Sequence, residues 1–394
     1  MAFIISNFLA ACKFKPESEF KSQLVPASLP ATTFMTTKRS PSDEEAEIMI
    51  SRLLEIHGRL EAIGSDHLKP CDEVNLLFGG LVDLCIKTVT ETVTNKVLND
   101  TRIVAILPSL HQLCAIAECH MESYWAKKVS NPTFSSDPSP PAHSSTMIAQ
   151  ANDRLSSFPY CQNYTDLTRM ELSALSSLIT PNSPPLQKFA FIGSGPLPLT
   201  SLCIYQTAAS FILPSQTHSF KLSGSKEETA PIEVLNIDIN PKAIAESKRL
   251  CESLGPGADG MSFLCSPADS PSLDLSNFDV VYLAALVGST QTDKEALLES
   301  VVGRMREGAF LVVRSAERLR RLLYPEFNPT TEKISSCLEI CLACVAWGCP
   351  RVQQSSREGI AGVKCIGFQS RRSRDIYPGL TKHLTASNIE RRLG

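Results

Sequence analysis

Apolar residues recur every three or four positions through most of residues 42–180, which is the spacing of amphipathic α-helices. The first of these helices is expected to begin near Ser42, which forms a capping box with Glu45. Another is expected to begin at Pro108, because proline suits the first turn of a helix. The pattern therefore predicts an all-helical domain over residues 42–180.

The pattern changes in residues 181–369, where short β-rich runs alternate with helical stretches. The runs are KFAFIG, IEVLNIDI, SFLCSPAD, DVVYLAAL and AFLVVRS. Such alternation is typical of a parallel sheet with helices on both faces. The sequence thus predicts an α/β fold, with a Rossmann-like, doubly wound sheet following the helical domain. A later run, SSCLEICLACVAWGC, spaces its cysteines as a helix would.

Four stretches are too polar, or too rich in proline and serine, to join a packed core. We expect a disordered tail, a Pro/Ser-rich insertion in the helical domain, a polar insertion in the sheet domain and a polar C-terminal tail; these span residues 1–41, 129–146, 216–231 and 370–394. The apolar start of the chain lacks the basic segment of a secretory signal, so we assign it to the first tail.

Composition narrows the possible partners. The 394 residues carry a net charge of −3, which argues against a nucleic-acid partner. No run of 18 uncharged apolar residues appears, so no membrane association is expected. Most of the 14 cysteines lie in apolar segments as small buried hydrophobes, and the cluster Cys337, Cys341, Cys344 and Cys349 lacks the further ligands of a metal site. We expect a cytoplasmic monomer or homodimer without a metal.

The stretch FIGSGPLPLTS has the layout of a strand, a tight loop and a helix. Gly193, Ser194, Gly195 and Pro196 form the loop and are expected to bind a ligand. Pro198 stands where a dinucleotide fingerprint has its third glycine, and proline has no N–H to offer a pyrophosphate. A phosphate-free adenosine ligand fits better, and S-adenosylmethionine (SAM) is such a molecule.

Further ligand contacts are expected where the next strands end, because ligands of doubly wound sheets bind at the carboxyl ends of strands. Asp238 follows the second strand and is placed to bind ribose hydroxyls. Asp269 follows the third and could bind the adenine amino group, while Ala284 and Leu286 follow the fourth. The alternative is a glycine corner with helix-capping acids and no ligand.

Longer motifs resemble those of the nicotianamine synthase family, in unbroken order over about residues 45–325. They are NLLFGGLVDLC, LHQLCAIAECHMES, FPYCQNYTDL, FIGSGPLPLTS, DVVYLAALVG and LVVRSAERLRRLLYP. The resemblance implies that SAM is a substrate and that no prosthetic group is needed. It also implies transfer of three 3-amino-3-carboxypropyl groups, which yields nicotianamine and methylthioadenosine. The tails resemble those of a fungal member.

The implied reaction needs a base, because the attacking amine is an ammonium at neutral pH. Glu118 and Glu122 lie four residues apart and share one helix face. The resemblance makes Glu118 the first candidate for the base and Glu122 a partner or substrate anchor; the alternative is a solvated helix face. Tyr160 and Tyr164 could bind the amine or a carboxylate, or could pack a helix–loop junction.

The chain departs from the family at two of these motifs. Ile116 replaces an acid that is common in plant members, and Cys161 replaces a tyrosine. Product carboxylates need cations, and Arg314 at the end of the fifth strand is expected to bind one. Arg320 matches a family arginine, although a surface salt bridge is equally plausible there.

Three other functions remain open at this point. A single-transfer relative would make an opine-type metallophore precursor, an ordinary methyltransferase would release adenosylhomocysteine, and a non-catalytic protein would bind SAM without turnover. The loop motif GSGPLPLTS does not distinguish among them.

Overall fold

The computed structural model describes residues 40–131, 146–179, 183–212, 231–284, 286–288, 290–346 and 363–370. Apart from their end residues, the predicted tails 1–41 and 370–394 and the insertions 129–146 and 216–231 lie outside these ranges.

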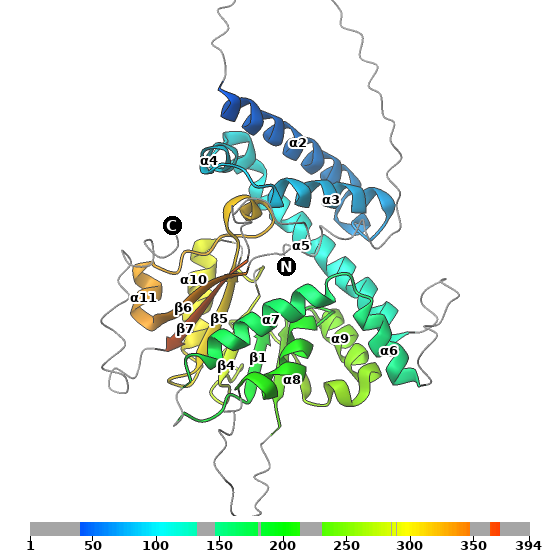
Figure 1. The fold of residues 1–394 in the computed structure, drawn as a ribbon, viewed down its shortest axis with the longest axis vertical. Coiled ribbons are helices and arrows are strands. Elements are labelled where there is room, and N and C mark those ends of the chain that lie inside the picture. The colour runs from blue at the N-terminus through cyan, green and yellow to red at the C-terminus, as the bar shows by residue number, and fades with distance from the viewer. Residues whose placement is uncertain are drawn as a thin grey trace, which may run out of the picture.

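A seven-stranded sheet forms the centre of the α/β body, in the order β3-β2-β1-β4-β5-β7-β6 (Figure 1). The strands are β1 Lys188–Ile192, β2 Glu233–Asp238, β3 Met261–Cys265, β4 Val280–Leu283, β5 Phe310–Ser315, β6 Leu338–Ala346 and β7 Val363–Ser370. The first five pair in parallel, and β7 runs antiparallel to both of its neighbours. The α/β prediction is confirmed, and each of its five strands is present.

The last two strands were not predicted. The cysteine-rich run that we assigned to a helix contains only the end of α11, Glu332–Cys337, before β6 begins. The helix prediction for this run is therefore wrong over residues 338–346, and the last three residues of the run lie outside the described ranges. Its closely spaced apolar residues suit a helix and a paired strand equally well, and pairing with β7 decides between them.

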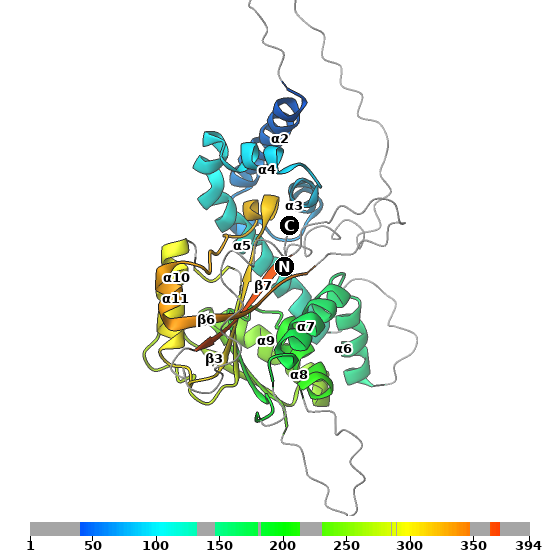
Figure 2. The same cartoon turned by 60° about the vertical axis from the view of Figure 1, so that its left-hand side comes forward.

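Helices cover both faces of the sheet because alternate residues of each strand point to opposite sides. Ala190, Val281 and Leu311 pack with α10, Gln291–Val302, and α11. Phe189, Val280 and Phe310 pack with α7, Cys161–Ser176, and α8, Leu199–Ile212. Figure 2 shows α10 and α11 on the side of the sheet away from α7, α8 and α9, Pro241–Leu254.

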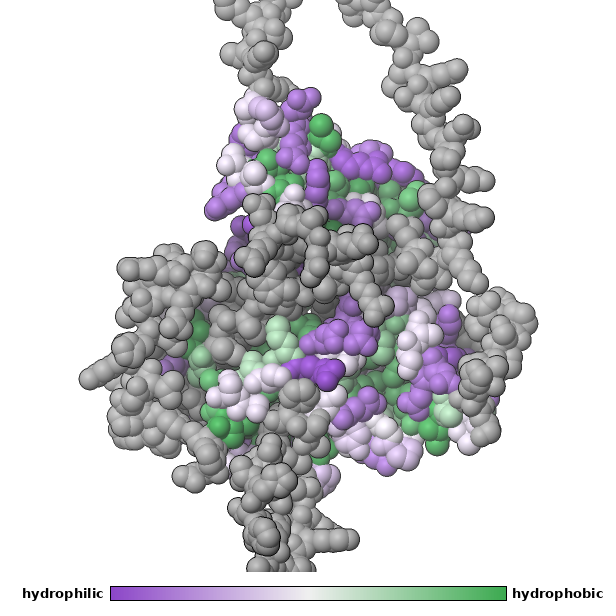
Figure 3. All heavy atoms as spheres, viewed as in Figure 1, coloured by the Kyte–Doolittle hydropathy of each residue, from purple (hydrophilic) through white to green (hydrophobic). Residues whose placement is uncertain are grey.

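A helical bundle stands beyond the carboxyl end of the sheet. It contains α2 Pro41–Ile63, η1 Ser65–His67, α3 Asp72–Ile86 and α4 Glu91–Leu98. Its apolar core is completed by Leu319 and Leu322 of η3, Arg318–Leu322, which follows β5. In the view of Figure 3 its surface is mainly hydrophilic with apolar side chains between. Because η3 follows β5, the bundle is connected to the sheet by a segment that is far away in the sequence from α2, α3 and α4.

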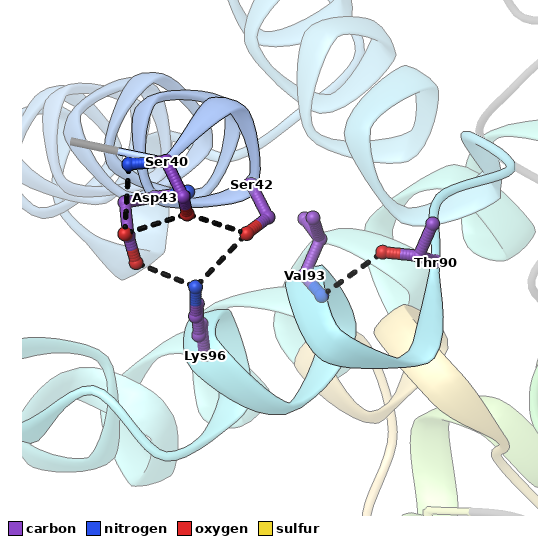
Figure 4. Close-up of polar contacts among 6 residues, drawn as sticks. All are labelled: Ser40, Ser42, Asp43, Thr90, Val93 and Lys96. Carbon is purple, nitrogen blue, oxygen red and sulfur yellow. Dashed lines mark hydrogen bonds and ion pairs between the residues drawn. The ribbon is translucent and has the colours of Figure 1, made fainter. Parts of the chain in front are cut away.

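The start of α2 differs slightly from the prediction. Ser40, not Ser42, is the N-cap, and it forms the capping box with Asp43 (Figure 4). Ser42 and Asp43 instead bind the Lys96 ammonium of α4. The first turn of α2 is thus held by its own cap and by a neighbouring helix.

The long helix α5, Thr101–Ser130, connects the bundle to the α/β body. It begins at an Asp100 cap rather than at Pro108, so the predicted start is wrong. Pro108 removes one helical hydrogen bond, but Val104, whose carbonyl loses its partner, is 54% exposed, so that water can replace the bond. By length and composition alone α5 could cross a membrane. Here its first half lies in the bundle core, and its second half packs against α9.

The packing divides the predicted helical segment 42–180 between two cores. The second half of α5, with α6, Met147–Ser156, shares a core with α8 and α9. The helix α7 packs on α8 and the sheet. The bundle core therefore ends within α5, and the residues of this helix near its middle lie where the two bodies meet.

Candidate active site

A cavity of 750 Å³ opens where the carboxyl ends of β1, β2 and β4 meet the middle of α5. The glycine loop after β1, Asp238 after β2, Asp269 after β3 and Ala284 after β4 contribute to its lining. The first part of α10 also contributes to the lining, through Asp293, Ala296 and Leu297. The cavity therefore lies at the sheet edge where ligands of doubly wound folds bind.

The glycine loop requires its two glycines. Gly193 and Gly195 have φ of +80° and +67°, a conformation that residues with a Cβ rarely adopt. A Cβ on Gly193 would lie 2.6 Å from a methyl group of Val287, and one on Gly195 would collide with the Glu122 carboxylate. The loop and Glu122 of α5 are thus in direct contact at the wall of the cavity.

Asp238 supports this loop. Its carboxylate accepts hydrogen bonds from the Gly195 N–H at 2.9 Å and from the Asn240 N–H at 2.8 Å. It also lines the cavity, and each carboxylate oxygen has a second lone pair for a ligand. The structure therefore gives Asp238 a role in shaping the loop beside the predicted binding of ribose hydroxyls.

Most of the other predicted ligand contacts also line the cavity. Pro196, Asp269, Ala284 and Leu286 do so. Ser194 does not: its side chain is buried, and its Oγ has no hydrogen-bond partner among the described residues. The loop is therefore expected to contact a ligand mainly through its backbone and Pro196.

The two predicted acids of α5 are buried at the cavity wall. Glu118 is 5% exposed and Glu122 is 7% exposed, so the alternative of a solvated helix face is wrong. Glu118 Oε1 has no hydrogen-bond partner among the described residues. Ile116 faces away and packs against the bundle core, so an acid at that position is not needed at this cavity.

Burial changes the protonation of both acids. It raises the pKa of Glu118 to about 7. It raises the pKa of Glu122 well above its ordinary value, and the charges of Glu118 and Asp238 add to that rise. Two carboxylates that are buried side by side resist ionising together. Glu118 is therefore poised to take up and release a proton near neutral pH.

Two phenols lie in the electrostatic field of these acids. Tyr164 of α7 and Tyr324 after η3 are buried, and burial with the charges of Glu118 and Glu122 raises the pKa of each phenol well above its ordinary value. Both stay protonated and can donate hydrogen bonds, although neither is among the described residues that line the cavity. Tyr324 was missed by the sequence analysis, although it lies in the motif RLLYP.

Tyr160 occupies a different environment. Its side chain is 0% exposed, and its ring packs edge-to-face on Phe158 with centroids 5.3 Å apart. It is not part of the cavity lining. Its placement agrees with packing of the junction before α7, and its predicted catalytic role has no support from this geometry.

The structure also places Arg314 away from the cavity lining. Its guanidinium is 1% exposed and donates to both carboxylate oxygens of Glu171, at 2.9 and 3.0 Å, and to Thr200 Oγ1 at 3.1 Å. This geometry corrects the prediction that Arg314 binds a product carboxylate. Its guanidinium already forms the two-pronged pair that it would offer such a ligand, with Glu171 of α7. Arg320 is buried within the bundle, which excludes a surface salt bridge.

The lining of the cavity is acidic. Glu118, Glu122, Asp238, Asp269 and Asp293 contribute carboxylates, and no lysine, arginine or histidine lies among the described lining residues. Such a site suits a cationic ligand, and it disfavours a pyrophosphate.

We expect Asp238→Ala to weaken SAM binding by about 10- to 100-fold, which corresponds to roughly 1.5–3 kcal/mol for hydrogen bonds to a charged group. The loss of the two bonds to backbone N–H groups loosens the glycine loop, while the strand core remains. Calorimetric titration measures the affinity, and Asp259→Ala, at an exposed position after η2 and outside the cavity lining, is the matched control. Unchanged affinity in Asp238→Ala would remove Asp238 from the site.

Comparison with known proteins agrees with the predicted family and fold. The family model described as nicotianamine synthase protein matches residues 42–345. Nicotianamine synthase 3 of Oryza sativa subsp. japonica is 32% identical over 298 residues, which cover 75% of each chain. Nicotianamine synthase 3 of Arabidopsis thaliana is 30% identical over 283 residues, or 72% of this chain and 76% of that protein.

Solved structures support the fold. MtNAS in complex with MTA and tNA superposes with a TM-score of 0.54 at 16% identity, covering 84% of this chain and 99% of that one. A glutamate-to-glutamine mutant of MtNAS gives a TM-score of 0.56 at 16% identity, over 82% of this chain and 98% of that one. The resemblance seen in the sequence motifs is confirmed, and the chain belongs to the nicotianamine synthase family.

Proposed function

We propose that this enzyme makes nicotianamine by transferring 3-amino-3-carboxypropyl groups from three SAM molecules, with release of methylthioadenosine. The observation that carries the proposal is the pair of buried acids on α5, which line the same acidic cavity as the glycine loop. The cavity volume of 750 Å³ is ample for one SAM together with an acceptor, because drug-sized ligands occupy pockets of about 300–1,000 Å³.

The chemistry follows from the protonation of these acids. Glu118 accepts the proton of the acceptor ammonium, and the freed amine attacks the Cγ of the donor. An N–C bond forms while the C–S bond breaks, and its electron pair goes to the sulfonium sulfur. The leaving group is then a neutral thioether, methylthioadenosine. The charges of the acids act on Tyr164 and Tyr324, which supports a role for these two phenols as hydrogen-bond donors in the proposed reaction.

The choice of the transferred group must come from orientation. The methyl group of SAM is the least hindered of the three carbons on sulfur. Transfer of the larger group requires the acceptor amine to lie along the Cγ–S bond, and holding reactants in line accounts for much of the rate of such reactions. Because α5 brings Glu118 and Glu122 to the cavity from the bundle side, the acceptor is expected on that side.

We expect the purified chain to turn over with SAM as sole substrate, because each transfer supplies the amine for the next. Mass spectrometry of the mixture should show nicotianamine and methylthioadenosine. Adenosylhomocysteine would instead indicate a methyltransferase. A requirement for an added amino acid, with one transfer per product, would favour the opine-type relative.

Three further features belong to the same proposal. Ten cysteines whose side chains the structure describes are free thiols, which supports a reducing, cytoplasmic location. The long tails and insertions support a fungal-type member. A soluble monomer or homodimer, without a nucleic-acid or membrane partner, is proposed from the composition.

A further inference from the structure

Because carboxylates line the cavity, its stability without a bound cation depends on how these acids are protonated. Glu118 and Glu122 are both nearly inaccessible to solvent, and Glu118 Oε1 has no hydrogen-bond partner among the described residues. A buried carboxylate without a partner is strongly disfavoured in its ionised form. An empty cavity therefore favours protonated acids.

The groups around the pair reinforce this preference. The groups that interact with it electrostatically are Asp238 at the end of β2, Tyr164 on α7, Tyr324 after η3, and Cys114 and Cys119 on α5. Farther out, Glu246 of α9 raises the pKa of the Cys119 thiol and Lys242 lowers it. Arg314, which is bound to Glu171, lowers the pKa of Tyr164. No described cation thus directly faces the two acids to hold them ionised.

We infer that the cavity sorts ligands by charge, because Glu118 and Glu122 share a proton while the cavity is empty and release it to solvent when a sulfonium or ammonium binds beside them. The inference rests on the proposed function and adds a selectivity to it. SAM carries the sulfonium charge, whereas adenosylhomocysteine and methylthioadenosine are neutral at sulfur.

The link between cation binding and proton release also affects turnover. Breaking the C–S bond removes the sulfonium charge, so the methylthioadenosine half loses its attraction to the acids and can leave. The aminocarboxypropyl product keeps its ammonium groups, which stay attracted to the same carboxylates. The same effect makes more of the base available when a cation is present, since ligand binding promotes ionisation of the pair.

The test compares SAM with adenosylhomocysteine on the full chain by calorimetry, in buffers of different ionisation enthalpy. SAM binding should release on the order of one proton near pH 7, and adenosylhomocysteine should release distinctly fewer. The preference for SAM, taken as the ratio of the two dissociation constants, should grow about tenfold between pH 6 and pH 8 as the pair ionises. Both ligands carry an α-amino and a carboxyl group, so the ratio isolates the sulfonium.

A double variant, Glu118→Gln with Glu122→Gln, should abolish the excess proton release and flatten the pH dependence of the ratio. Glutamine has the shape of a protonated glutamate, so the variant mimics the empty state, and it also corrects for protons exchanged by the ligand itself. Glu252→Gln on the exposed face of α9 is the control and should change neither quantity.

The two hypotheses fail differently. If SAM binds and products form, but proton release is equal for the two ligands and the ratio does not change with pH, the inference is wrong and the proposed function stands. If SAM does not bind at all, the proposed function fails and takes the inference with it.

Discussion

Glu118→Gln should lower turnover by about 10²–10⁴-fold, the usual contribution of a general base, while SAM still binds. Glutamine keeps the volume and hydrogen bonding of the side chain but cannot accept the proton of the acceptor ammonium. Glu122 and Asp238 remain in the cavity to attract the sulfonium. Steady-state kinetics of methylthioadenosine release, with a parallel SAM titration, separates the two effects.

The pH profile gives a second readout. Burial raises the pKa of Glu118 to about 7, and a base acts in its ionised form. In the unchanged chain kcat/KM should therefore rise with pH up to about 7 and then level off. In Glu118→Gln that inflection should be absent, and the residual rate should keep rising at higher pH as free amine forms without help.

Glu122→Gln is the matched comparison, because it removes a neighbouring buried acid on the same helix face. It should cost less in turnover, since we assign it an anchoring role at the glycine loop. If Glu122→Gln is inactive and Glu118→Gln is near normal, the two roles are reversed. If both variants stay active, the base lies elsewhere.

Much of the site could be predicted from the sequence because it depends on local patterns. A β-rich run followed by Gly-Ser-Gly indicates a strand and a turn, and strand order then brings Gly193, Asp238 and Asp269 to one sheet edge. The spacing of Glu118 and Glu122 places both on one helix face whatever the helix packs against.

The burial of these side chains and the residues that they contact could not be predicted from local patterns. Whether Glu118 faces water or a cavity depends on the angle at which α5 crosses the glycine loop, which no local pattern encodes. Tyr324 comes within the influence of the acids' charges because it packs with η3 into the bundle core, and Arg314 pairs with Glu171, which is far away in the sequence. For the same reason the helix prediction failed at β6, where pairing with β7 overrides local spacing.

Arg314→Leu should destabilise the fold by about 3–5 kcal/mol, because it leaves the Glu171 carboxylate buried without its partner. The melting temperature should fall on the order of 10 °C. Adding Glu171→Leu should recover most of the loss, since an apolar pair can replace a buried ion pair.

Arg102→Leu is the matched control for Arg314→Leu, because Arg102 also binds both carboxylate oxygens of a glutamate, Glu47, each at 2.9 Å. That pair is exposed, so water screens it and the melting temperature should stay nearly unchanged. The comparison also decides the role of Arg314. If Arg314→Leu melts like Arg102→Leu yet forms no product, the guanidinium binds a product carboxylate after all. If stability falls and the double leucine variant regains both stability and turnover, Arg314 anchors α7 to the sheet and thereby fixes Tyr164 near the acids.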